Sequence, residues 1–186
     1  MKALVFLAQN THLETDRLLL RPMTVDDLRD YHEYTSNSEL LRYDYPEHES
    51  IEESLESLVT WNLSQPLGRY GIELKADNRL IGNISLRVNA EEDTVAEIGY
   101  TLHPAYHAKG YATEAAQALL RLAQQIPTIK TVVGHVDNRN LASIRVLEKL
   151  GMELVSETDK INLRGENIIS RKYEINVKDL NKEQTE

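Results

Sequence analysis

The most informative absence in this chain of 186 residues is cysteine, of which it has none. Without cysteine there are no disulfides, no thiolate-bound zinc sites and no thiol nucleophiles, and the composition fits a reducing compartment. No apolar run approaches the ~20 residues of a membrane span. Met1–Asn10 holds only a short apolar stretch, without the cleavage site of a secretory signal. These absences predict a soluble, cytoplasmic protein with no membrane partner.

Positive charge is also scarce. The chain has 21 Lys and Arg residues against 30 Asp and Glu residues, a formal net charge of −9. Because nucleic-acid binding neutralises phosphates with clustered Lys and Arg, no direct nucleic-acid partner is expected. An acidic surface favours a cationic substrate, although the same charge also serves solubility alone.

Several ligand-binding motifs are missing as well. There is no GxxxxGK[ST], no GxGxxG and no helical HExxH in the chain. His103 and His107 are four apart, but Pro104 lies between them in a predicted turn. No metal site is therefore expected.

The order of the remaining patterns predicts one α/β domain, residues 1–178, with a polar tail, 179–186. A strand at Arg17–Arg21 precedes a capping-box-like helix start at Thr24, and apolar residues at helical spacing follow between Ser50 and Asn62. Three strands, expected to form an antiparallel meander, come next. They are followed by a helix, a central strand, a second helix ending at Gly151 and two closing strands. The ranges are Tyr70–Lys75, Leu80–Val88, Thr94–Leu102, Tyr111–Gln125, Ile129–Val136, Leu141–Leu150, Glu153–Thr158 and Ile168–Val177.

The segment Tyr106–Ala115, YHAKGYATEA, lies between a predicted strand and a predicted helix and has the character of an anion site. The first turn of a helix leaves its backbone N–H groups unpaired, and the helix dipole adds partial positive charge there. Gly110 lets a phosphate approach the backbone, Ala112 keeps the next turn narrow, and Lys109 adds charge. Taken alone, Gly110 could equally permit an ordinary turn.

This segment and its surroundings resemble the GCN5-related N-acetyltransferase (GNAT) superfamily. His107–Ala112 is similar to the family's Gln/Arg-x-x-Gly-x-Gly/Ala acetyl-coenzyme A loop, and Asn140-x-x-Ser143 followed by VLEKLGM is similar to its second coenzyme-side helix. Thr15–Leu28 resembles the branch of ribosomal-protein N-terminal acetyltransferases (RimJ/RimL type). The resemblance implies a mixed, mostly antiparallel sheet flanked by helices, with acetyl-CoA as co-substrate. Two residues depart from the family pattern: His107 stands where Gln or Arg is commoner, and Ala108 stands where glycine is frequent in this branch.

The resemblance also implies which residues contact the coenzyme. A backbone N–H of Ile98, Gly99 or Tyr100 is expected to bond the thioester carbonyl and stabilise the oxyanion. The full expected set is Ile98, Gly99, Tyr100, Leu102, His107, Ala108, Lys109, Gly110, Tyr111, Ala112, Thr113, Asn140 and Ser143. Asn140 could equally serve as the N-cap of its helix.

Acetylating an amine requires its deprotonation, because alkyl and α-amines have pKa values near ~10 and ~8. Glu97 is the candidate base, directly or through water, since strand alternation puts it on one face with Gly99 and Thr101. An ordinary solvent-facing glutamate is the alternative. Ser143 is the candidate proton donor to the leaving thiolate.

The acceptor itself is harder to read from the sequence. Tyr43, Tyr45 and His48 fall where the family's acceptor cleft forms, although an exposed loop is equally compatible with them. The leading hypothesis is a protein N-terminal α-amine. A small amine, such as a polyamine, amino sugar or antibiotic, and a non-catalytic acyl-CoA-binding module are alternatives. Monomer and homodimer both stay open.

Overall fold

The computed structural model describes residues 2–88 and 93–180. Most of the turn expected at Asn89–Asp93, and the tail from residue 181 onward, lie outside these ranges. In the described part of the chain, no helix has the length and apolar character needed to cross a membrane.

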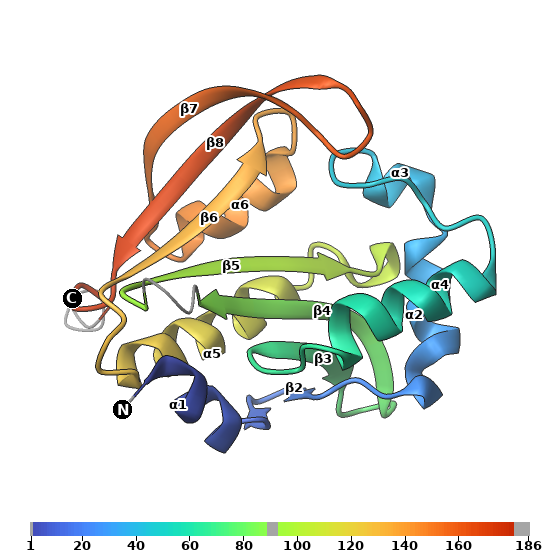
Figure 1. Ribbon diagram of the computed structural model, residues 1–186, viewed down its shortest axis with the longest axis horizontal. Coiled ribbons are helices and arrows are strands. Elements are labelled where there is room, and N and C mark those ends of the chain that lie inside the picture. Colours follow the sequence, from blue (N-terminus) through green and yellow to red (C-terminus); the bar gives the residue numbers. More distant parts are fainter. Residues whose placement is uncertain (1, 89–92, 181–186) are drawn as a thin grey trace.

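The described strands form one mixed sheet in the order β1-β2-β3-β4-β5-β6-β8-β7, shown in Figure 1. Every neighbouring pair is antiparallel except β5 and β6. The expected meander of β3, β4 and β5 is confirmed, as is the interior position of β6. The bounds are β1 Leu13–Glu14, β2 Leu18–Arg21, β3 Arg69–Leu74, β4 Arg79–Val88, β5 Val95–Leu102, β6 Thr131–Asp137, β7 Glu153–Ile161 and β8 Asn167–Asn176.

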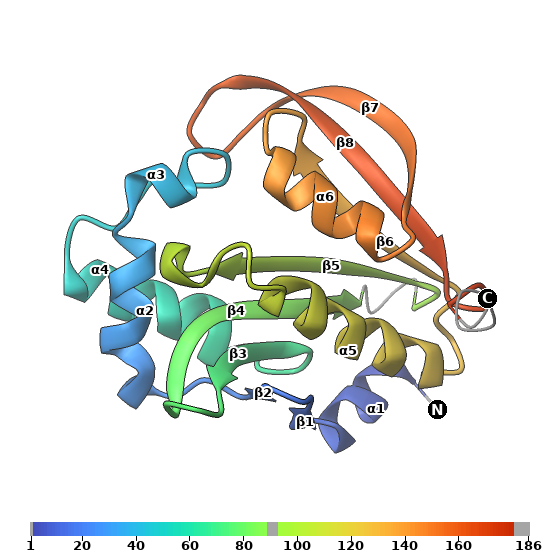
Figure 2. The ribbon, with the colours of Figure 1, turned by 180° about the vertical axis from the view of Figure 1, so that it is seen from behind.

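Helices cover both faces of this sheet (Figures 1 and 2). The apolar stripe of α5, which includes Leu119, Leu122 and Ala123, is buried in the main core. On the other face, Tyr31 and Tyr34 of α2 pack with Leu58 of α4 in a second cluster. The bounds are α1 Ala3–Gln9, α2 Leu28–Thr35, α3 Ser38–Leu41, α4 Ile51–Leu58, α5 Tyr111–Gln125 and α6 Leu141–Lys149.

The sheet opens between β5 and β6. These two strands pair in parallel only from Val95–Glu97 to Thr131–Val133, and no register pair follows in the described residues. Figure 1 shows the strands diverging from that point. The second half of β5, from Ile98 to Leu102, therefore keeps one backbone edge free of a sheet partner, and ligands can reach it.

Local signals explain where several helices begin and end. Thr24 and Asp27 form the expected capping box ahead of α2. Gly151 follows α6 with a φ of 75°, the left-handed conformation that ends helices at glycine. Gly134 of β6 lets α6 pack closely, because a Cβ there would lie 3.0 Å from Leu147.

The stretch between Ser50 and Asn62 is helical, as expected, but it ends in a π-helical turn at Val59–Leu63. Of its five apolar residues only Leu58 is buried, and Trp61 is 62% exposed. The short elements α1, β1 and α3 have too few residues for a periodic pattern, and the sequence did not predict them.

Candidate active site

A cavity of about 530 Å³ lies between the start of α5 and α6, and we call it the helix-side cavity. Figure 2 shows that both helices begin at the same end of the molecule. Its lining includes the predicted coenzyme residues Tyr100, Leu102, His107, Ala108, Gly110, Tyr111, Ala112, Thr113, Asn140 and Ser143. Residues far apart in the sequence are thus brought to one site.

The loop before α5 presents its backbone to this cavity. Gly110 has a φ of 83° and Ala108 a φ of 58°, so both adopt the left-handed conformation. No acceptor within residues 2–88 and 93–180 meets the backbone N–H groups of Tyr111, Ala112 and Thr113. Converging N–H groups at a helix start are the donors that a pyrophosphate needs, so the residues fit coenzyme A.

Arg17 fixes this loop to the sheet. Its guanidinium pairs with Glu114 of α5 at 2.6 Å and donates a hydrogen bond to the Lys109 carbonyl at 2.9 Å. It also lies 4.3 Å from the centre of the Tyr111 ring. Thr15 donates a further hydrogen bond to Glu114 at 2.6 Å, and these bonds lower the pKa of Glu114 against the opposing effect of burial. The loop is therefore held in shape before any ligand binds.

Two predicted coenzyme side chains are engaged elsewhere. His107 Nε2 lies 2.7 Å from the Leu102 carbonyl, so the imidazole ties the loop to the end of β5. Lys109 Nζ lies 5.3 Å from the centre of the Tyr106 ring, and Lys109 is absent from the lining of the helix-side cavity. The His107 N–H donates to the Pro104 carbonyl and the Lys109 carbonyl accepts from Arg17, so both residues shape the loop.

At the start of α6, Asn140 Oδ1 accepts a hydrogen bond from the Ser143 N–H at 3.2 Å, so Asn140 is an N-cap. Ser143 Oγ accepts a hydrogen bond from the Tyr100 hydroxyl at 3.3 Å. Burial raises the pKa of Tyr100. The structure thus places two hydroxyl groups together, whereas the sequence pointed to Ser143 alone.

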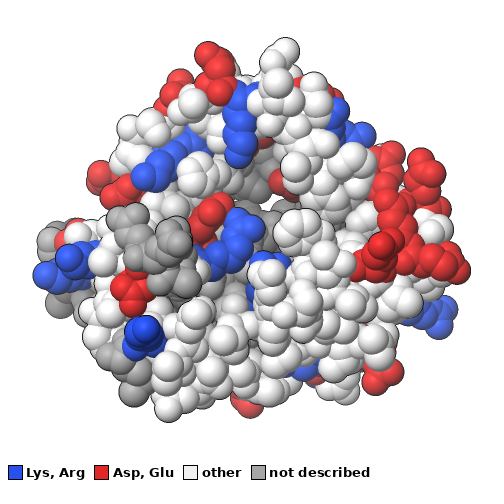
Figure 3. Space-filling view, viewed as in Figure 1, with Lys and Arg blue, Asp and Glu red and all other residues white. Residues whose placement is uncertain are grey.

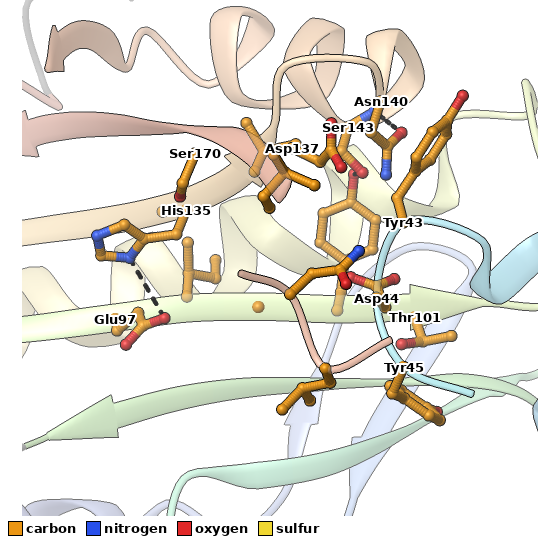
Figure 4. A pocket seen from close by; sticks show the side chains of 18 of the residues that line it. Tyr43, Asp44, Tyr45, Glu97, Thr101, His135, Asp137, Asn140, Ser143 and Ser170 are labelled. Carbon is orange, nitrogen blue, oxygen red and sulfur yellow. Dashed lines mark hydrogen bonds and ion pairs between the residues drawn. The ribbon is translucent and has the colours of Figure 1, made fainter. Parts of the chain in front are cut away.

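A second cavity of about 490 Å³, the strand-side cavity, lies between the middle of β4 and β5 and the β7–β8 hairpin. Figure 3 shows this face hollowed, with acidic and basic side chains side by side in the hollow. Glu97 lines it, as alternation predicted, together with Gly99 and Thr101. The Glu97 carboxylate lies 2.7 Å from Arg87 and 3.5 Å from His135 Nδ1, the contact drawn in Figure 4.

The tip of the β7–β8 hairpin bridges this cavity. Arg164 donates hydrogen bonds to the Tyr45 carbonyl and to the Glu47 carboxylate, both at 3.0 Å. Figure 1 shows the β7–β8 hairpin as an arch, and these contacts join the tip of the arch to the loop after α3. A ligand in the strand-side cavity would lie between this arch and β5.

Of the three predicted acceptor residues, the structure brings two together. Tyr43 and Tyr45 line the strand-side cavity, and burial raises the pKa of Tyr45. His48 does not line either cavity. It is 7% exposed, bonds Ser54 at 2.9 Å and packs between Tyr31 and Tyr45, and its own desolvation lowers its pKa. This placement corrects the expectation that His48 is a pocket residue, because its side chain packs against α2 and α4 instead.

The two cavities meet. Six residues line both of them: Tyr43, Asp44, Tyr100, Thr101, Asn140 and Ser143. Sequence reasoning did not assign roles to Asp44 or to the Tyr100 hydroxyl. In the sequence, Asp44 is distinguished only by its position between Tyr43 and Tyr45. It lies in an acid-rich segment, so nothing sets it apart from the neighbouring carboxylates. The described residues contain no cluster of three or more side chains suited to a metal ion.

Comparison with known proteins agrees with this geometry. The model of the acetyltransferase (GNAT) domain matches residues 17–153. The uncharacterized N-acetyltransferase YnaD of Bacillus subtilis (strain 168) is 34% identical over 141 residues, covering 76% of this chain and 82% of that protein. Escherichia coli (strain K12) spermidine N(1)-acetyltransferase is 27% identical, with 74% of each chain covered.

Solved structures share the fold. A GNAT-family acetyltransferase from Bacillus anthracis has a TM-score of 0.80 at 28% identity, covering 90% of this chain and 99% of that one. The ribosomal L7/L12 α-N-protein acetyltransferase RimL, in complex with coenzyme A, has a TM-score of 0.75 at 20% identity and covers 87% and 95%. With the family model, the relatives and a loop that fits the coenzyme, the chain belongs to the GNAT family and is an acetyl-CoA-dependent N-acetyltransferase.

Proposed function

We propose that the acceptor is the α-amine of a protein N-terminus, for example that of a ribosomal protein in the cytoplasm. The observation that carries this proposal is the mixed charge of the strand-side cavity. Its lining contains the carboxylates of Asp44, Glu97 and Asp137, but also Arg87, His135 and Lys160. Two of the three carboxylates are already paired, Glu97 with Arg87 and Asp137 with Arg139, which leaves one for an ammonium group.

A peptide suits such a lining better than a polycation does. Peptide groups bond to donors and acceptors alike, whereas the extra ammonium groups of a polyamine would each need an unpaired anion. A polyamine is the second candidate, because spermidine N(1)-acetyltransferase is among the relatives.

The chain's own residues divide the work of the reaction. Acetyl-CoA supplies the acetyl group as an activated thioester. The N–H groups at the start of α5 bind its pyrophosphate, and a backbone N–H of Ile98, Gly99 or Tyr100 on the free edge of β5 stabilises negative charge on the carbonyl oxygen. Glu97 accepts the amine proton through a relay of several waters along β5, and Ser143, beside Tyr100, donates a proton to the sulfur.

The test measures free-thiol release from acetyl-CoA with short peptides bearing free N-termini, spermidine and simple amines. We expect release that depends on the peptide amine, and a fall of about 10²-fold or more in Glu97→Gln. Glu157→Gln is the matched control, because Glu157 also pairs with an arginine but lies outside both cavities.

Two outcomes would redirect the assignment. Turnover with spermidine but with no peptide would replace the α-amine with a polyamine. Coenzyme binding without release for any amine, unaffected by Glu97→Gln and Ser143→Ala but abolished by Gly110→Glu, would indicate a non-catalytic acyl-CoA-binding module.

A further inference from the structure

Asp44 is set apart from the other carboxylates of the two cavities by having no partner. Glu97 pairs with Arg87, Asp137 with Arg139 and Glu39 with Arg42. Across the ranges that the structure describes, no hydrogen bond or ion pair reaches the Asp44 carboxylate. The Asp44 side chain is exposed and lines the walls of both cavities, so its unpaired carboxylate is open to a cationic ligand.

The position of Asp44 is that of the reacting groups. It lines both cavities, with Tyr100, Thr101 and Ser143 around the same junction. Figure 4 shows Asp44 beside Thr101 and Tyr43, while Glu97 and His135 lie at the opposite end of the view. Glu97 and Thr101 are four strand residues apart, roughly 13 Å along β5. Asp44 is therefore the carboxylate at the junction itself.

The surroundings of Asp44 favour a positive ligand. Desolvation and then the charge of Asp137 raise the pKa of Asp44 to about 6. The Tyr43, Tyr45 and Tyr100 hydroxyls lie around the same junction, and burial raises the pKa of Tyr45 and of Tyr100. A bound cation would relieve the repulsion between the two carboxylates and hold Asp44 ionised.

We infer that Asp44 binds the ammonium group of the acceptor at the junction of the two cavities. The inference rests on the proposed function and adds a residue for acceptor recognition. The N–H groups that bind the coenzyme pyrophosphate belong to the start of α5, and Asp44 is not among them.

The experiment compares a free-amine tripeptide amide with its N-acetyl counterpart, which has no ammonium group. Binding is measured by calorimetry in the presence of coenzyme A, so that no reaction occurs. We expect the wild type to favour the free amine by about 10-fold or more, and Asp44→Asn to remove this preference. Acetyl-CoA affinity should stay within about 2-fold, which also reports correct folding.

The pH profile of kcat/KM provides a second readout. Ionised Asp44 is required, and ionisation is gained as the pH rises through about 6. Below that pH, the logarithm of kcat/KM should therefore rise more steeply with pH in the wild type than in Asp44→Asn. His135→Gln is measured alongside, because His135 also lines the strand-side cavity.

The outcomes separate the two proposals. Peptide acetylation with an unchanged acceptor KM in Asp44→Asn overturns the role of Asp44 and leaves the acceptor assignment standing. Ammonium-dependent binding that needs Asp44, without any peptide turnover, refutes the acceptor assignment alone. If the wild type binds the free-amine tripeptide amide no more tightly than its N-acetyl counterpart, the inference about Asp44 is wrong.

Discussion

Among single residues, Ala108 carries a conformational cost that glycine would avoid. Its φ of 58° is left-handed, which costs a residue with a Cβ about 1–2 kcal/mol. Glycine removes that cost but loses about 0.5–1 kcal/mol to the entropy of the unfolded chain. We therefore expect Ala108→Gly to raise the free energy of unfolding by about 0–1 kcal/mol, measured by urea denaturation.

The control for this prediction is Ala142→Gly. Ala142 is an exposed alanine in the first turn of α6, where the backbone is helical. Glycine there has no strain to remove and should destabilise the protein. Equal destabilisation by both substitutions would contradict the conformational argument for Ala108.

Among the elements, the tip of the β7–β8 hairpin is held to the loop after α3 by one arginine. Arg164 supplies both hydrogen bonds that join the hairpin to the loop after α3. Bonds to a charged, half-buried donor are worth about 1.5–3 kcal/mol before solvent screening reduces them. We expect Arg164→Met to raise the acceptor KM by about 3–10-fold, with acetyl-CoA affinity unchanged.

Glu47→Gln should have a smaller effect, because the bond from Arg164 to the Tyr45 carbonyl remains. Arg171→Met is the matched control, since Arg171 pairs with Glu157 within the same hairpin and lines neither cavity. A KM increase of the same size in Arg171→Met would show that general loosening of the hairpin, and not the bridge, is responsible.

At the scale of the whole molecule, charge is unevenly distributed. Figure 3 shows acidic side chains gathered over α3 and α4, beside the hollow of the strand-side cavity. Glu39, Glu49, Glu52, Glu53 and Glu56 lie on or between these helices and are exposed. Such a surface raises the local concentration of cationic acceptors.

This field should make catalysis sensitive to salt. The screening length falls from about 30 Å at 0.01 M salt to about 8 Å at 0.15 M. We expect kcat/KM for a cationic acceptor to fall about 3–10-fold over that range, and less steeply in Glu52→Gln/Glu56→Gln. A salt dependence that is unchanged by the double substitution would exclude these helices as its source.

Sequence by itself determined the features that depend on neighbouring residues. The strands of the meander, the bounds of α5 and α6, the Thr24 capping box and the Gly151 helix end all follow from alternation, helical periodicity and local backbone preferences. The same local reasoning predicted anion-site character for the loop before α5, while the resemblance to the GNAT superfamily supplied its assignment to acetyl-CoA.

Only the tertiary structure decided which distant side chains meet. Asp44 lines both cavities and His48 lines neither, because α2 and α4 pack as they do, and no periodic pattern encodes that packing. Tyr100 meets Ser143 because β5 and β6 separate after Glu97 and α6 lies behind the opening. Such contacts join segments far apart in the sequence, so they are fixed by how the helices and strands pack and not by local preference.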